Sequence, residues 1–175
     1  MSSPLISLDT HWQDANSIAL PPELAPWLLE PASLTARLKR HCQHFRVQLL
    51  QQQDARLPAF LAALLPDTRM AQVREVILWC NDKPCVYAQS WLPEATVDAL
   101  RPLADLGERP LGDFIFQHQD LTRGKIEAAS VQLALAELPN ESCLARRSVF
   151  CLQRQPLLVA EVFLPALLTL CEVQA

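Results

Sequence analysis

The 175-residue sequence predicts a single α+β domain built around an antiparallel sheet. Apolar stretches with strand-like composition follow one another with only short turn signals between them, which favours antiparallel pairing over parallel pairing through helical crossovers. Helical spacing of apolar residues is confined to two regions, near residues 21–42 and 94–106. Half of the residues are apolar and 19% are charged, so a chain of this length can bury a substantial core within one domain.

The first half of the chain begins with an irregular segment, residues 1–19, and the domain is expected to span residues 20–175. Two helices are predicted over residues 21–29 and 34–42, with Ser33 as the N-cap of the second helix and cations near its C-terminal end. A half-buried strand should follow, and then a polar connection and a short apolar helix or turn. These three segments are assigned to residues 45–49, 51–53 and 58–66.

The second half contains the clearest hairpin, with strands over residues 69–80 and 85–92 joined by a turn at residues 81–83. Apolar residues at helical spacing predict a helix over 94–106 that ends at Gly107, and a compact turn that opens a short helix follows at residues 110–116. Three more strands, separated by turn signals at 140–142 and 154–155, are predicted over residues 121–135, 146–153 and 157–164. The hairpin and these three segments give five clear strands, in addition to the half-buried strand over residues 45–49.

Two charges lie within otherwise apolar strands. Glu161 is the one charged residue in a run of Val, Leu, Ala and Phe between two prolines, and Arg74 shares its strand face with Val76 and Leu78. Because burying an unpaired charge is unfavourable, the two residues suggest an enclosed polar pocket in the sheet. The alternatives are a structural ion pair or a sheet edge that faces water. Glu75, on the opposite face of the strand from Arg74, is interpreted as structural.

Composition limits the other classes of function. A net charge of −4 with no basic block does not indicate nucleic-acid or membrane-surface binding, and no signal peptide or membrane span is recognised, so a cytoplasmic protein is expected. The six cysteines form no C-x-x-C pair and are interpreted as reduced. His41, Cys42 and His44 are clustered but lack further ligands, so no metal site is predicted. The three glycines stand apart, so no phosphate-binding loop and no cofactor are predicted.

Five short motifs in a fixed order resemble bacterial chorismate lyase. The resemblance covers residues 20–165, and the motifs are Val73-Arg74-Glu75-Val76, Pro110-Leu111-Gly112, Leu121-Thr122-Arg123, Arg146-Arg147-Ser148 and the run from Pro156 to Pro165. It implies a six-stranded antiparallel sheet with helices on one side that form flaps over an internal ligand pocket. It also implies conversion of chorismate to 4-hydroxybenzoate and pyruvate for ubiquinone biosynthesis, by a monomer that needs no cofactor.

The same resemblance implies roles for four residues. Arg74 matches the arginine that binds the ring carboxylate, Glu161 the acid at the 4-hydroxyl end, and Leu111 a contact made through the backbone. Leu34 stands in the helical flap where the family commonly has methionine, and Cys143-Leu144-Ala145 replaces a familiar Gly-Trp-Gly stretch. An arginine fork suits a carboxylate, and this reaction requires no covalent nucleophile, metal or redox group.

A second carboxylate contact is hypothesised for Arg123 or Arg147, and the alternative is that both are surface or ion-pair residues. Two other functions stay open at this point. The same fold serves as a non-catalytic, small-molecule sensing domain in bacterial transcription regulators, and a purely structural role would leave Arg74 and Glu161 as an ion pair. Conversion of chorismate distinguishes the enzyme from both.

Overall fold

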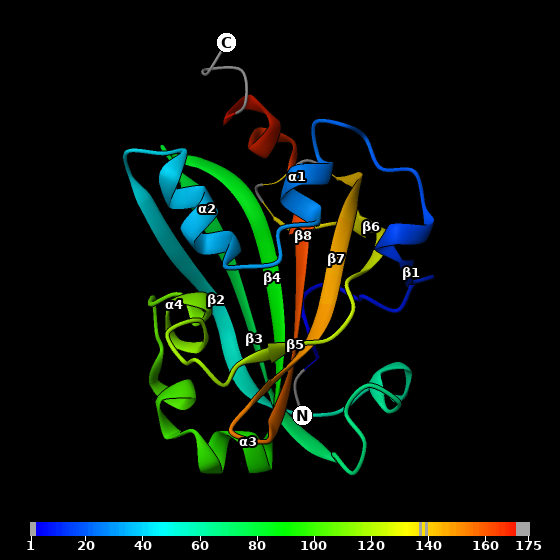
Figure 1. Ribbon diagram of the computed structural model, residues 1–175, viewed down its shortest axis with the longest axis vertical. Helices are drawn as coiled ribbons and strands as arrows, with labels where there is room; N and C mark the ends of the chain where they lie inside the picture. Colours follow the sequence, from blue (N-terminus) through cyan, green and yellow to red (C-terminus); the bar gives the residue numbers. More distant parts are fainter. Residues whose placement is uncertain (1–2, 137, 139, 171–175) are drawn as a thin grey trace.

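One antiparallel sheet organises the computed structural model, which describes residues 3–136, 138 and 140–170 (Figure 1). Within the described residues the sheet has eight strands in the order β1-β6-β7-β8-β4-β3-β2, with β5 paired to β7. The strands are β1 (Gln13–Asp14), β2 (Phe45–Arg56), β3 (Met70–Cys80), β4 (Lys83–Pro93), β5 (Thr122–Arg123), β6 (Glu127–Leu133), β7 (Glu141–Leu152) and β8 (Gln155–Phe163). The α+β class and the antiparallel sheet are confirmed, whereas the expected count of six strands is corrected to eight.

Both additional strands are two residues long. One is β1, which pairs with β6 at the edge of the sheet. The other arises because the single strand predicted over 121–135 is interrupted between β5 and β6. Arg123 pairs with Phe150 of β7, and Glu127 pairs with Arg147 of β7. The chain therefore advances four residues from Arg123 to Glu127 while β7 advances three, and the extra residue interrupts the ladder as a β-bulge does.

Two hairpins fix the register of the central strands. Asn81 and Asp82 both have positive φ, and so do Gln153 and Arg154, as two-residue turns with the right-handed twist require. The β3–β4 hairpin is therefore confirmed. The β7–β8 turn lies one residue earlier than the sequence signal suggested.

The polar connection predicted at residues 51–53 is wrong, because β2 continues to Arg56. A register shift between Leu49 and Gln51 changes which side chains face each side of the sheet. After this bulge Gln51 stands opposite Glu75 and Gln52 stands opposite Arg74. The glutamine amides therefore bond to buried charged groups on β3, a pairing that polarity alone does not reveal.

The helices are short. They are α1 (Ala25–Leu28), α2 (Leu34–Arg40), α3 (Glu94–Ala99) and α4 (Leu111–Ile115), with 3-10 turns η1 (Ala15–Ser17), η2 (Ala59–Leu61), η3 (Arg101–Asp105) and η4 (Pro165–Leu170). The predicted N-cap is confirmed, since Ser33 Oγ accepts a hydrogen bond from the Ala36 amide at 3.1 Å. The helix predicted over 94–106 is instead α3 followed by η3. Pro102 explains the break, because proline disfavours α-helical backbone at the residue before it and has no N–H.

Helices α1, α2 and α4 lie over one face of the sheet (Figure 1), here called the front face. Side chains of α1 and α2 pack there on β3, β4 and β8, whereas η3 and α4 pack with Leu92, Phe150 and Leu157 in a separate cluster. The opposite, back face is covered by η2 and by the N-terminal segment, whose Ile6 and Leu8 are buried among residues of β4, β7 and β8. The segment predicted to be irregular therefore contributes to the core.

The back face contains a buried carboxylate. Glu75 is fully buried and accepts hydrogen bonds from the Leu5 amide at 2.8 Å, from the Tyr87 hydroxyl and from Gln51 Nε2. Burial, followed by the Glu75 charge, raises the pKa of Tyr87, so this hydroxyl keeps its proton and donates. The interpretation of Glu75 as structural is consistent with these contacts.

Replacement of Glu75 with alanine should destabilise the protein by about 3 kcal/mol, because buried donors would lose their acceptor. Urea unfolding measures this change in the free energy of unfolding. The control is Glu23→Ala, which removes an exposed carboxylate. An equal effect of the two substitutions would contradict the structural role of Glu75.

The five cysteines in the described part of the chain are free thiols, and Cys171 lies outside it. Burial raises the pKa of Cys85 to about 11, as expected for an inert core thiol. No helix in the described ranges is long and apolar enough to cross a membrane.

Candidate active site

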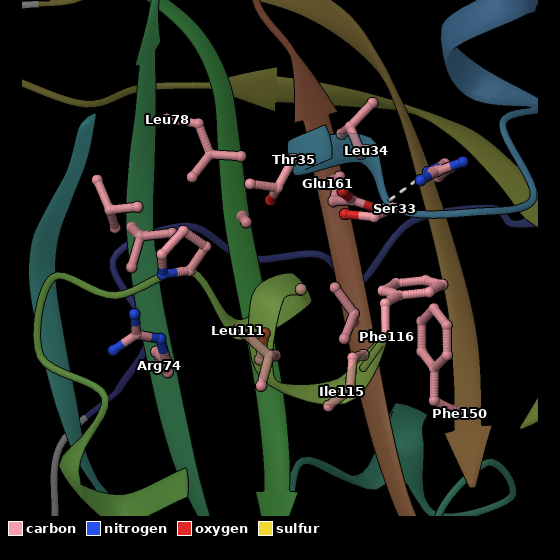
Figure 2. Close-up of a pocket in the computed structure, with 18 of the residues that line it drawn as sticks. Ser33, Leu34, Thr35, Arg74, Leu78, Leu111, Ile115, Phe116, Phe150 and Glu161 are labelled. Carbon is pink, nitrogen blue, oxygen red and sulfur yellow. Dashed lines mark hydrogen bonds and ion pairs between the residues drawn. The ribbon is translucent and has the colours of Figure 1, made fainter. Parts of the chain in front are cut away.

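A cavity lies on the front face, between the cover formed by α2 and that formed by α4. Its floor comes from β3, β4, β7 and β8, and its walls from the start of α2 and from residues 110–116 (Figure 2). The floor side chains alternate along each strand, so the residues between them point to the back face. The lining residues belong to both front-face clusters of apolar side chains, so the cavity lies between these clusters.

Arg74 lies at one end of the cavity and is 2% exposed. Its Nη1 donates to Gln52 Oε1 at 3.1 Å and to the Gly107 carbonyl at 2.9 Å, and its Nη2 donates to the Arg109 carbonyl at 2.9 Å. Gly107 and Arg109 lie four and two residues before Leu111, so Arg74 also holds the loop that leads into α4. Burial lowers the pKa of Arg74 to about 10, because desolvation disfavours its charged form.

Glu161 lies at the other end and forms a buried ion pair with Arg146. Arg146 Nε donates to Glu161 Oε1 at 2.9 Å, and the side chains of Arg146 and Glu161 are 1% and 10% exposed. The two residues stand opposite each other on β7 and β8. Only β4 lies between the strands of Arg74 and Glu161, so two inter-strand spacings and two residues along the strand place their Cα atoms about 12 Å apart. They do not form the ion pair that the structural alternative required.

The structure separates the two candidates for a second carboxylate contact. Arg123 lines the cavity, stacks over Phe150 with 4.7 Å between the guanidinium carbon and the ring centroid, and donates from Nε to Ser148 Oγ at 3.0 Å. Its Nη2 is buried and has no hydrogen-bond partner. Burial, followed by the charge of Arg146, lowers the pKa of Arg123 to about 10. An anion in the cavity would satisfy the unpartnered donor and offset the buried charge.

Arg147 lies on the back face, where it pairs with Glu127 at 3.1 Å and stacks over Trp12. It does not line the cavity. The hypothesis of a second carboxylate contact is therefore carried forward for Arg123 alone.

The remaining predicted residues belong to the cover. Leu34, at the start of α2, and Leu111, at the start of α4, both line the cavity, and Leu111 lies in the area between Arg74 and Glu161 in Figure 2. The two helices meet closely, because a Cβ atom on Gly112 would lie 3.2 Å from both Ser33 Oγ and Thr35 Oγ1. On the outside, Lys39 Nζ and Asp113 Oδ2 form a salt bridge of 2.8 Å. The α2 and α4 covers are thus joined above the cavity.

Sequence reasoning missed several lining residues, of which Arg146 is the most important. Adjacent residues on a strand face opposite sides, so Arg146 and Arg147 must diverge, but the sequence does not say which of them faces the pocket. Ser148 and Phe150 share the face of Arg146, but only the structure shows that this face meets the cavity. Ser33, Thr35 and Ser90 add hydroxyl groups to the lining.

The charged residues that line the cavity are three arginines, Arg74, Arg123 and Arg146, and one carboxylate, Glu161. The formal charge of the lining is therefore +2, which is suited to a ligand with two negative charges. Apolar and aromatic side chains fill the space between the charges, as in most small-molecule pockets. Among the described residues, no group of three or more His, Cys, Asp or Glu side chains is arranged to hold a metal ion.

Comparison with solved structures shows that the fold is shared with domains of bacterial regulatory proteins. The C-terminal domain of the histidine utilization repressor from Pseudomonas syringae matches with a TM-score of 0.56 and 16% identity, and the match covers 70% of this chain and 93% of that chain. The effector domain of PhnF from Mycobacterium smegmatis also matches with a TM-score of 0.56 and 16% identity, over 77% and 90% of the two chains. At this identity the comparisons show a shared fold alone.

Sequence comparison is more specific, and the chain belongs to the chorismate lyase family, whose model matches residues 7–173. A relative in Pseudoalteromonas translucida, named probable chorismate pyruvate-lyase, is 46% identical over 170 residues, which cover 91% of this chain and 94% of that protein. A protein of the same name in Idiomarina loihiensis is 38% identical, over 91% and 87% of the two chains. The predicted resemblance is confirmed.

Proposed function

We propose that this protein eliminates pyruvate from chorismate to give 4-hydroxybenzoate for ubiquinone biosynthesis. The observation that carries the proposal is the charge of the cavity, whose three arginines and one glutamate complement a dianion with two carboxylates. Family membership supports the same reaction. A monomer, located in the cytoplasm, is the proposed active unit.

In the proposed complex Arg74 binds the ring carboxylate, and the backbone of Leu111 makes a further contact at this end. Glu161 orients the 4-hydroxyl group at the other end, about 12 Å away between Cα atoms, a span that leaves room for a ring between the two side chains. Arg123 Nη2 binds the enolpyruvyl carboxylate, and Leu34 closes the cavity from α2. The α2 and α4 covers exclude water, which strengthens each of these polar contacts.

The proposed chemistry needs only positioning and charge stabilisation. The C3–O bond breaks, and its electrons form the carbonyl group of pyruvate. The hydrogen on C4 moves to the methylene carbon of the enolpyruvyl group, and the C4–H electrons complete the aromatic ring. Because the hydrogen and the electrons stay within the substrate, an orienting pocket with cations near the departing carboxylate is sufficient.

The test is incubation of the purified protein with chorismate, with 4-hydroxybenzoate followed by absorbance and pyruvate by a lactate dehydrogenase assay. Equimolar formation of both products, above a blank without protein, is expected. The fold shared with effector domains favours one other function, a non-catalytic sensor. Absence of turnover, together with an increase in melting temperature on addition of 4-hydroxybenzoate, would support the sensor and contradict the lyase.

A further inference from the structure

Two arginines on the sheet reach the same short segment of the cover, residues 28–31, which connects α1 to α2. Arg146 Nη1 donates to the carbonyls of Leu28 at 3.0 Å and Glu30 at 2.7 Å. Arg123 Nη1 donates to the carbonyls of Glu30 at 3.2 Å and Pro31 at 3.3 Å. Three backbone carbonyls of the connection are therefore held by two guanidinium groups that come from β7 and β5.

These carbonyls need such donors for a physical reason. Helix α1 has only four residues, so the last carbonyls of the helix and of the connection after it lack partners within the helix. A cation at a helix C-terminal end is also favoured by the helix dipole. The side chain of Glu30 lies 3.7 Å from both Arg37 and Arg40 of α2, which links the connection to the helix that follows.

Both arginines also line the ligand cavity. Arg146 Nε bonds to Glu161, and Arg123 Nη2 is the buried donor without a partner. Arg146 therefore contacts the α1–α2 connection through Nη1 and Glu161 in the cavity through Nε, whereas Arg123 holds the connection through Nη1 and has a buried, unpartnered Nη2. A guanidinium group is rigid and planar, so a shift at one nitrogen moves the others.

We propose that Arg146 is a positioning residue that couples Glu161 to the α1–α2 connection, with Arg123 as the second link. A ligand that bonds to Glu161 and to Arg123 Nη2 fixes both guanidinium groups, and these in turn hold residues 28–31 and the start of α2 over the cavity. The proposal rests on the proposed function for the identity of the ligand, 4-hydroxybenzoate. The contacts with the backbone do not depend on it.

Hydrogen exchange of Arg146→Lys tests the coupling, with Arg147→Lys as the matched control on the opposite face. The reporters are the amides of Ala36 and Arg37, which bond to Ser33 Oγ and to the Ser33 carbonyl. Lysine keeps the positive charge but lacks the separate guanidinium nitrogens that bond to Glu161 and to the backbone carbonyls. Amide hydrogen exchange in a peptide over residues 30–40 should therefore become about tenfold faster in the ligand-free protein. Arg147→Lys should leave this exchange unchanged.

The ligand-bound state gives the readout that a merely structural role would not change. Saturating 4-hydroxybenzoate should slow exchange over residues 30–40 in the wild-type protein but not in Arg146→Lys, whose dissociation constant for 4-hydroxybenzoate should rise about tenfold. If Arg146→Lys does not fold, Arg123→Lys tests the second link in the same way. The proposal would be overturned if Arg146→Lys and Arg123→Lys kept the wild-type exchange rate and the wild-type affinity for 4-hydroxybenzoate. It would also be overturned if Arg147→Lys had effects of the same size. If the wild-type protein does not convert chorismate but Arg146→Lys still shows faster exchange, the lyase assignment is overturned and the proposed coupling stands.

Discussion

Replacement of Arg74 with methionine is expected to lower kcat/KM for chorismate by about a thousandfold, because two charge-assisted hydrogen bonds to the ring carboxylate are lost. The same substitution should lower the melting temperature modestly, because three hydrogen bonds are lost while a buried charge is also removed. Burial lowers the pKa of Arg74 to about 10, because desolvation disfavours its charged form in the empty cavity. Methionine fills much of the same volume without a buried charge, but it leaves Gln52 Oε1 and the Gly107 and Arg109 carbonyls without their donor.

Steady-state kinetics and a thermal melt, measured on the same preparation, test this combination. Arg101→Met is the control, because Arg101 is exposed on η3 and does not line the cavity. Loss of activity that is fully explained by unfolding at the assay temperature would indicate that Arg74 serves mainly to hold the loop through the Gly107 and Arg109 carbonyls. Retained activity would contradict the assignment of Arg74 to the ring carboxylate.

The sequence was most informative where a charge interrupts an apolar strand. Arg74 and Glu161 could be selected because few residues in β3 and β8 are charged, and because alternation places Arg74 on the face of Val76 and Leu78. The hairpin at Asn81 and Asp82 was predictable for a similar reason, since turn chemistry is local. Leu34 and Leu111 came from the family resemblance rather than from any physical signal.

The remaining parts of the site depend on pairings that are distant in the sequence. Gln52 meets Arg74 only because a bulge in β2 shifts the register. The choice between Arg146 and Arg147 depends on which face of β7 is covered by α1 and α2. Composition and periodicity reveal neither the bulge nor the covered face. Residues 51–53 were therefore interpreted as a connection, and Arg147, which lies on the back face, remained a candidate.

Glu161 is expected to show a graded response in which glutamine retains at least about a tenth of the wild-type kcat and alanine loses about a thousandfold. Glutamine can still accept from Arg146 Nε and still bond to the 4-hydroxyl group, but it cannot take a proton. Alanine removes both contacts and leaves the buried Arg146 unpaired. Partial activity of Glu161→Gln therefore follows if Glu161 orients the substrate while the hydrogen moves within it.

Base catalysis by Glu161 predicts a different pattern, because general bases contribute about a hundredfold to ten-thousandfold and glutamine would then be as inactive as alanine. Single-turnover measurements of 4-hydroxybenzoate formation separate this chemical step from slow product release. Glu127→Gln provides the control, since Glu127 forms the equivalent ion pair with Arg147 on the back face at 3.1 Å. It should leave turnover unchanged, because its ion pair lies on the side of the sheet away from the cavity.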